Sequence, residues 1–290
     1  MKLILGDKTN ETLRLIHNNL TNNNNEQVVW LEAQDIINEL FIHDFINEKG
    51  VTLRWLYRET EISPEYTTGV LNFLFDTFNI EESFLKDFVE RDREYASKEF
   101  YSYLIFALNQ FTNVINPPWG GSMSGYCHSL LYQWRFVKQI DRNIKVPRSF
   151  FGLIKDAPDD LILGYNTIVS DDAFDGRYWK TGVSQNLLND NHYLFYRRPR
   201  GNPFVITILD NKMWVQSLAQ PICSTQVLKK VSFLCHTLME HFHLRFAEIL
   251  FFFDEQANLY TFGSIIPYMD VRKIPRANIS EFIEAVCNTL

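Results

Sequence analysis

Residue types that could do chemistry are few in this chain, and their spacing limits what they can do. Arg197, Arg198 and Arg200 form a short basic stretch that could bind one phosphate or one acidic segment of a partner. His241 and His243 would share a face of a strand but not of a helix, so we expect no metal pair there. The four cysteines lie far apart, without the paired spacing of a zinc site or a disulfide framework.

Composition and charge narrow the class of protein. The 290 residues are 46% hydrophobic and 22% charged, which is ordinary for a globular chain of one large or several small domains. The net charge of -7 argues against nonspecific binding to nucleic acid or to anionic membranes, because both rely on clustered Lys and Arg. No apolar run is long enough to cross a bilayer, and the first residues are too short an apolar run for a secretory signal. We therefore expect a cytoplasmic protein that binds neither nucleic acid nor membrane.

The first third of the chain has the alternation of strands and helices that is typical of a parallel α/β domain. Prolines and glycines at residues 117–121 favour a domain boundary there. The expected elements are strands at residues 2–5, 28–31, 51–57 and 114–116 and helices at residues 13–20 and 81–111.

The rest of the chain predicts mixed sheets with helices against them. The expected strands are residues 161–169, 193–196, 203–209, 213–217, 246–253 and 259–262, and the expected helices are residues 129–140, 227–242 and 279 onward. The fold class is therefore α/β (α+β). We divide the chain into domains at residues 1–121, 122–200 and 201–290.

This order of elements resembles the ATP-grasp fold. More narrowly, it resembles the ligases that macrocyclise ribosomally made peptides by joining side-chain carboxylates to hydroxyls or amines (graspetide ligases). In the family's C-terminal third, a helix ends in a Leu-Gly-Leu-like turn, a strand carries an Asp, and a second strand ends in Leu-Glu-Ile-Asn-Pro. Here the same outline reads residues 241–246, the strand to Phe253, and residues 260–267.

Earlier segments fit the same outline. Residues 146–149 resemble the family's Pro-x-Thr after a helix, and residues 193–197 resemble the strand that leads to the adenine hinge. The resemblance implies an N-terminal parallel α/β domain that is followed by central and C-terminal mixed-sheet domains.

The resemblance also implies a magnesium site whose ligands are replaced in this chain. The family's strand Asp falls at Leu250, and the Glu and Asn of the final motif fall at Ser264 and Ile266. Magnesium prefers hard oxygen ligands, chiefly carboxylates, and two of these three side chains are apolar. We interpret the three as degenerate metal positions and expect no cofactor, with ATP and magnesium as the alternative.

The cationic positions are altered as well. The family's Arg after the hinge falls near Val205, and its two ATP lysines fall near Tyr132 and residues 164–165. A relocated metal site from Glu248 and Asp270 is the alternative, because Glu248 precedes Leu250 by two residues and shares its face of a strand. The residues left for a nucleotide, if one binds, are Tyr196, Arg197, Arg198 and Lys180.

The resemblance implies a leader or precursor peptide as the natural partner. We therefore expect a non-catalytic subunit for peptide modification that binds such a peptide or a catalytic ATP-grasp partner, and a second copy of the chain is a further candidate partner. The alternative is an active ATP-dependent carboxylate–amine or carboxylate–hydroxyl ligase with a displaced metal site. Aromatic residues could line a peptide groove or fill the core, namely Trp119, Tyr126, Trp134 and Trp179.

Overall fold

The computed structural model describes residues 1–24, 26–48, 50–74, 89–119, 123–125, 128–162, 167–170, 191–219 and 223–290. The chain forms two compact units. Unit 1 comprises Met1–Tyr126, His243–Phe246 and Tyr268–Leu290, and unit 2 comprises Cys127–Phe242 and Ala247–Pro267. The last residues of the chain thus belong to the first unit, and our division into three domains stays a prediction.

Unit 1 is built on a four-stranded sheet in the order β2-β1-β8-β9, in which all neighbours are parallel. Leu3, Ile4 and Leu5 are all fully buried, as expected for a strand that is covered on both faces. The connection from β1 to β2 runs through α1, which confirms the predicted strand–helix–strand unit. These elements are β1 (Lys2–Leu5), α1 (Glu11–Asn24), β2 (Val28–Leu31), β8 (Gly69–Asn72) and β9 (Val114–Ile115).

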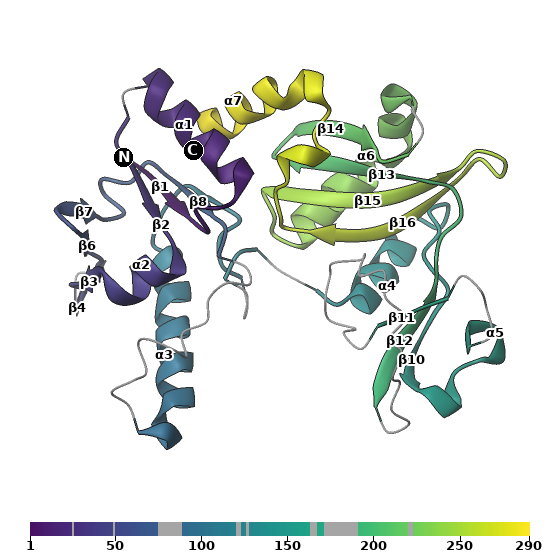
Figure 1. Cartoon of the computed structure of the whole chain (residues 1–290), viewed down its shortest axis with the longest axis horizontal. Coiled ribbons are helices and arrows are strands. Elements are labelled where there is room, and N and C mark those ends of the chain that lie inside the picture. Colours follow the sequence, from purple (N-terminus) through teal and green to yellow (C-terminus); the bar gives the residue numbers. More distant parts are fainter. Residues whose placement is uncertain are drawn as a thin grey trace. The chain divides into compact units, whose positions relative to one another are not determined.

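Helices cover this sheet. On one face α1 packs beside α7 (Ile279–Thr289), and the two run side by side in Figure 1. Leu3 and Leu5 point to the other face, where they share a core with Leu104 of α3 (Glu90–Leu108). The predicted helix over residues 81–111 is confirmed for α3, and residues 81–88 lie outside the described part. Shorter helical turns complete the unit, namely α2 (Ala33–Asn38), η2 (Val271–Lys273) and η3 (Arg276–Asn278).

A long β-ribbon over residues 40–57 extends from unit 1. Its partners keep one constant register from Leu40 opposite Tyr57 to Asn47 opposite Gly50. The single strand predicted over residues 51–57 is interrupted at residues 53–54, where the side chain of Asp44 accepts a hydrogen bond from the Arg54 backbone. The strands of this region are β3 (Leu40–Ile42), β4 (Phe45–Asn47), β5 (Gly50–Thr52), β6 (Trp55–Tyr57) and β7 (Thr60–Ile62).

Unit 2 contains two antiparallel sheets, in the orders β10-β12-β11 and β14-β13-β15-β16. The first consists of β10 (Ser149–Leu153), β11 (Thr167–Ser170) and β12 (His192–Arg197). The second consists of β13 (Asn202–Leu209), β14 (Lys212–Ser217), β15 (Phe246–Asp254) and β16 (Leu259–Ile266). The helices are α4 (Leu130–Ile140), η1 (Ile154–Asp156), α5 (Asp159–Ile162) and α6 (Ser224–His241). The mixed α/β fold class is confirmed.

The strand predicted over residues 161–169 is wrong for its first part. Residues 159–162 form α5. Within the described part of the predicted range, the strand is confined to β11, residues 167–170. Pro158 precedes two aspartates at the start of α5, and both features favour a helix N-terminus over a strand.

Within the described segments, we find no helix with the length and apolar character needed to cross a bilayer.

A buried asparagine ties the returning segment of the chain to the sheet of unit 1. Asn116 has a positive φ of 55°, which asparagine tolerates better than most residues. Its Oδ1 accepts hydrogen bonds from the backbone N–H groups of Arg245 (3.1 Å) and Phe246 (2.9 Å), and its Nδ2 donates to the Phe246 carbonyl (2.9 Å). One side chain therefore satisfies three backbone groups where β15 begins.

We predict that Asn116→Ala lowers the free energy of unfolding by about 3 kcal/mol, because buried backbone groups lose their partner. Asn38→Ala, on the exposed side of α2, serves as the control and should change it by less than about 0.5 kcal/mol. Urea unfolding of both variants measures the difference, and equal costs would contradict the role of Asn116.

Candidate functional site

The three residues that we interpret as degenerate metal positions lie on one antiparallel strand pair of unit 2. Leu250 of β15 is directly opposite Ser264 of β16, and Glu248 is directly opposite Ile266. Residues opposite each other in an antiparallel pair share a face of the sheet. The structure therefore brings Leu250, Ser264, Ile266 and Glu248 together on one face, which we call the 250/264 face.

A bulge sets this arrangement. The register shifts between Leu250 and Phe251, so that Gly263 of β16 is the extra residue. A side chain at Gly263 would be crowded, because its Cβ would lie 3.0 Å from the Cγ of Leu250. The glycine thus allows Leu250 to pack directly against the backbone of β16.

The opposite face of the sheet is filled by aromatic rings. Phe251 stacks on Phe204 of β13 at a centroid distance of 5.5 Å and meets Phe262 of β16 edge-on at 5.7 Å. Because neighbouring residues of a strand point to opposite faces, Val205 and Thr207 of β13 lie on the 250/264 face. The resemblance places the family's arginine near Val205.

The 250/264 face does not fit a magnesium ion at its expected position. Leu250 is 5% exposed, and neither it nor Ile266 offers an oxygen ligand. Ser264 is buried and supplies only a neutral hydroxyl. Among the described residues, no group of three or more His, Cys, Asp or Glu could hold a metal ion. The chemistry at these positions is apolar packing.

One hydroxyl on this face lacks a partner within the described residues. The Thr207 hydroxyl is buried, and it has no hydrogen-bond partner in the part of the chain that the structure describes. A buried hydroxyl without a partner costs free energy, and a bound group could provide the missing hydrogen bond.

Glu248 and Asp270, the two alternative metal ligands, belong to different units. Glu248 is a buried residue of unit 2, whereas Asp270 belongs to unit 1. Both carboxylate oxygens of Asp270 accept hydrogen bonds from the Arg272 guanidinium, at 2.8 and 2.9 Å. Burial alone would raise the pKa of Asp270, but the side-chain and backbone hydrogen bonds from Arg272 outweigh it and lower the pKa. Asp270 therefore already has a cationic partner.

The predicted nucleotide residues lie at the end of β12. Tyr196 is buried against Trp134 at a ring distance of 5.5 Å, and burial raises the pKa of Tyr196 to about 12. Arg197 forms an ion pair with Asp160 (3.0 Å), which also binds Arg148 (2.8 Å). The exposed Arg198 follows them. Lys180 lies outside the described residues, so the structure brings together only part of the predicted set.

The predicted aromatic groove residues do not form one surface in the described chain. Trp134 is a core residue of unit 2. Trp119 is 44% exposed and stacks on His243 at 3.9 Å in unit 1. Tyr126 and Trp179 lie outside the described residues.

Helix α4 closes the open edge of β16 beside the 250/264 face. The Gln133 amide donates to the Ile265 carbonyl (3.2 Å) and accepts from the Ile265 backbone N–H (2.9 Å), as a neighbouring strand would. Trp134 Nε1 donates to the Gly263 carbonyl at 2.7 Å. The sequence analysis named Trp134 as a groove or core residue but missed Gln133, because a Gln within an amphipathic helix gives no signal of burial.

A cluster of stacked rings joins α4 to the end of α6. His241 stacks on Phe136 at 3.6 Å, and its Nε2 lies 3.0 Å from the Tyr132 hydroxyl. His128 stacks on Tyr132 at 4.2 Å. Burial, with a smaller contribution from His241, lowers the pKa of His128 to about 4. The cluster therefore keeps His128 neutral in the folded protein at physiological pH.

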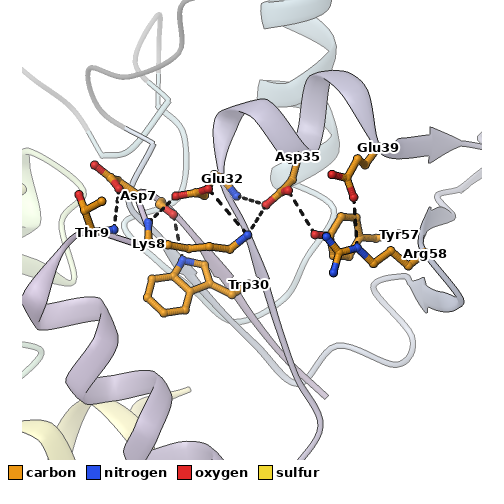
Figure 2. A network of polar contacts seen from close by, with 10 residues as sticks. Asp7, Lys8, Thr9, Trp30, Glu32, Asp35, Glu39, Tyr57 and Arg58 are labelled. Carbon is orange, nitrogen blue, oxygen red and sulfur yellow. Dashed lines mark hydrogen bonds and ion pairs between the residues drawn. The ribbon is translucent and has the colours of Figure 1, made fainter.

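A second polar network lies in unit 1, where β1 and β2 end (Figure 2). The Lys8 ammonium contacts Asp35 at 2.7 Å and Glu32 at 3.8 Å, and the Tyr57 hydroxyl donates to Asp35 at 3.2 Å. Burial would raise the pKa of Asp35, but the Glu32 backbone N–H and Lys8 lower it. The charges of Lys8 and Asp35 thus compensate each other. The sequence signal was available, since the carboxyl ends of neighbouring parallel strands meet at one edge.

The chain matches solved structures along nearly its whole length. The macrocyclase MdnC bound with precursor peptide MdnA, from Microcystis aeruginosa MRC, superposes with a TM-score of 0.72 at 12% identity, over 99% of this chain and 100% of that one. The Chryseobacterium gregarium RiPP-associated ATP-grasp ligase in complex with ADP and a leader and core peptide gives 0.70 at 12% identity, over 100% and 98%. The chain has the ATP-grasp fold.

A third match concerns the cofactor. The ATP-grasp ligase PsnB complexed with a phosphomimetic variant of a minimal precursor, Mg and ADP gives a TM-score of 0.69 at 12% identity, over 99% of this chain and 96% of that one. Nucleotide and magnesium thus belong to proteins with this fold, and our expectation of no cofactor is corrected. No protein-family model and no curated protein sequence matches the chain.

We predict that Gln133→Leu lowers the free energy of unfolding by about 2 to 4 kcal/mol, because it leaves the Ile265 N–H and C=O buried without a partner. Gln139→Leu changes an exposed residue of the same helix and should cost less than about 0.5 kcal/mol. Urea unfolding compares the two variants. A cost below about 1 kcal/mol for Gln133→Leu would show that the edge is closed by other means.

We predict that the protein loses stability as the pH falls from about 6.5 toward 4, in part through His128. The unfolded chain binds the proton near pH 6.5, whereas the folded chain binds it only near pH 4. In this window the unfolded state carries more protons, so the free energy of unfolding decreases as the pH decreases. His128→Phe should reduce this slope in urea unfolding between pH 4.5 and 7, and His192→Phe, at an exposed site, should leave it unchanged.

Proposed function

We propose that the chain is a non-catalytic ATP-grasp-fold protein that binds a leader or precursor peptide in ribosomal peptide modification, alone or beside a catalytic ATP-grasp partner. The observation that carries this proposal is the pairing of Leu250 with Ser264. An apolar residue and a hydroxyl occupy the positions where the family holds its metal with carboxylates.

The chemistry of the family explains why this pairing matters. An ATP-grasp ligase phosphorylates a carboxylate with ATP, and an amine or hydroxyl then attacks the acyl phosphate. The charge that develops on the transferred phosphoryl group requires a metal and cationic side chains. At the expected positions this chain carries Leu250, Ser264, Ile266 and Val205, none of which bears a charge.

The solved structures of this fold support a peptide as the ligand. MdnC and the Chryseobacterium gregarium ligase were both solved with precursor peptides, and each matches this chain over almost its full length. A nucleotide is compatible with the proposal, because the fold holds ADP in such proteins and a bound nucleotide can order a peptide site without being turned over. The unpartnered Thr207 hydroxyl offers one hydrogen bond to such a ligand.

A second candidate function is an active peptide ligase with a displaced metal site. The observation that favours it is Glu248, a carboxylate on the same face as Leu250 and two residues before it in β15. Under this alternative Glu248 would hold the metal, and the substrate class would remain a carboxylate that is joined to an amine or a hydroxyl.

The two functions differ in ATP turnover. We predict that the full chain, incubated with ATP, magnesium and a synthetic precursor peptide, releases no ADP above the background without protein. The missing metal ligands remove several kcal/mol of transition-state stabilisation, which is at least about a hundredfold in rate. Isothermal titration with the same peptide should show binding.

If turnover is found, two variants test whether Glu248 is responsible for it. Turnover that is lost in Glu248→Gln but kept in Glu255→Gln, at an exposed position of the β15–β16 turn, would establish the active ligase. The absence of both turnover and peptide binding would reject both functions.

A further inference from the structure

The basic stretch at residues 197–200 has no role in the candidate site on β15 and β16. Arg197 ends β12, and its backbone N–H donates to the carbonyl of Arg148, the residue before β10, at 3.0 Å. The register of β10 and β12 places Arg148 opposite Arg197. Residues opposite each other in an antiparallel pair share a face of the sheet, so the two side chains lie together. We call them the 148/197 arginine pair.

A single carboxylate contacts both arginines. Arg148 reaches Asp160 with two nitrogens, Nη1 to Oδ2 at 2.8 Å and Nη2 to Oδ1 at 2.9 Å. Arg197 Nη2 donates to the same Oδ2 at 3.0 Å and to the Asp160 carbonyl at 3.1 Å. Among the ion pairs of the described residues, Asp160 alone is shared by two arginines, whereas Arg58 and Arg272 each have an acid of their own. The pair therefore has two positive charges and one counter-charge.

The contacts of Arg197 leave part of its guanidinium for a ligand. Within the described chain its side-chain hydrogen bonds all come from Nη2, so Nε and Nη1 have no partner there. The side chain is 48% exposed, and that of Arg148 is 60% exposed. Guanidinium groups bind carboxylates through short, charge-assisted hydrogen bonds. Because Asp160 already holds Arg197 in place, a ligand needs to order little more of this side chain.

The 148/197 arginine pair lies on the face of its sheet that is turned away from the 250/264 face. Tyr196 packs on Trp134, whose Nε1 donates to the Gly263 carbonyl of β16. Arg197 follows Tyr196 in β12 and points to the opposite face, because neighbouring residues of a strand alternate. On that face α5 packs on β12 (Figure 1). A ligand of the arginine pair therefore lies outside the candidate site.

The segments around the pair carry an excess of positive charge. Residues 148–160 and 197–200 contain five Lys or Arg and three Asp, although the chain as a whole has a net charge of -7. The backbone after the basic stretch is fixed, since Gly201 has a φ of 99° and its Cβ would lie 2.3 Å from the Phe253 carbonyl oxygen. Charges that are spread along a fixed backbone suit a chain with several carboxylates. A single phosphate instead needs donors that converge on one point.

We propose that the 148/197 arginine pair binds an acidic segment of the peptide, outside the stretch that contacts the 250/264 face. The inference rests on the proposed function, in which a peptide is the ligand. A carboxylate of this segment accepts a hydrogen bond from Nε or Nη1 of Arg197 and supplies the second counter-charge of the pair. Acidic residues that flank the recognised stretch thus add affinity through a second point of contact.

Fluorescence anisotropy of the full chain tests the proposal with a labelled peptide of four glutamates between Gly-Ser spacers. We expect Arg197→Gln to raise the dissociation constant of this probe at least about tenfold, as for the loss of one charge-assisted hydrogen bond. Arg276→Gln removes the same charge at an exposed position of η3 and should leave the constant unchanged. The same peptide with four glutamines should not bind. Equal binding of the two peptides, or equal effects of the two variants, would overturn the proposal.

Asp160→Asn distinguishes a ligand site from an ion pair that only holds α5. The variant removes the competing carboxylate and keeps both arginines, so the glutamate peptide should bind at least about threefold more tightly. If the arginines only hold α5, Asp160→Asn and Arg197→Gln break the same contacts, and a similar loss of binding in both would refute the site. Circular dichroism confirms that each variant is folded. Displacement of the probe by an equal concentration of inorganic phosphate would identify a phosphate site and also overturn the proposal.

A synthetic precursor peptide distinguishes a failure of the arginine site from a failure of the proposed function. If the precursor peptide binds equally to the unchanged chain and to Arg197→Gln, and the glutamate peptide does not bind, only the arginine site is rejected. If the precursor peptide does not bind at all, the proposed function is rejected whatever the glutamate peptide does.

Discussion

The closure of the β16 edge by α4 is the interaction on which the candidate site depends. Gln133 forms two hydrogen bonds with the Ile265 backbone, and Ile265 lies between Ser264 and Ile266. This contact keeps the end of β16 in register after the bulge at Gly263. A slip of one residue would move every side chain beyond the bulge to the other face, and Ser264 would no longer meet Leu250. The edge contact therefore determines which residues the 250/264 face presents.

Apolar residues on the 250/264 face remove the need for a metal ion to stabilise it. Several carboxylates on neighbouring strands repel one another until a cation neutralises them, which makes such a face dependent on its metal. Leu250 instead packs on Gly263 and contributes to the core. Under our proposal Leu250 replaces a metal ligand, and the same replacement would remove a source of repulsion. The proposed loss of the metal site and the stability of this face would then have a common cause.

The sequence predicts the fold better than the contacts of the site. Strand and helix periodicity identified most elements, because alternation and helical spacing follow directly from which side chains are buried. The strand predicted over residues 161–169 failed because local signals at Pro158 start a helix instead. The roles of Gln133 and Asn116 were not predictable, since each polar side chain finds its partner on a distant segment. The assignment of Leu250, Ser264 and Ile266 as former metal positions comes from the resemblance and stays a prediction.

The buried polar side chains Asn116 and Gln133 form hydrogen bonds with backbone groups. They therefore stabilise the fold and do not indicate its chemistry. Asn116 and Gln133 each bind both the N–H and the C=O group of one strand residue, Phe246 and Ile265 respectively. Such contacts are needed whatever ligand the protein binds, because an unpaired buried backbone group is costly. Thr207 is different, since its hydroxyl has no partner among the described residues although it lies on the 250/264 face. The hydroxyls of Ser63, Thr67 and Thr167 share this property elsewhere in the described chain, so it is the place of Thr207 on the 250/264 face that relates it to the candidate site.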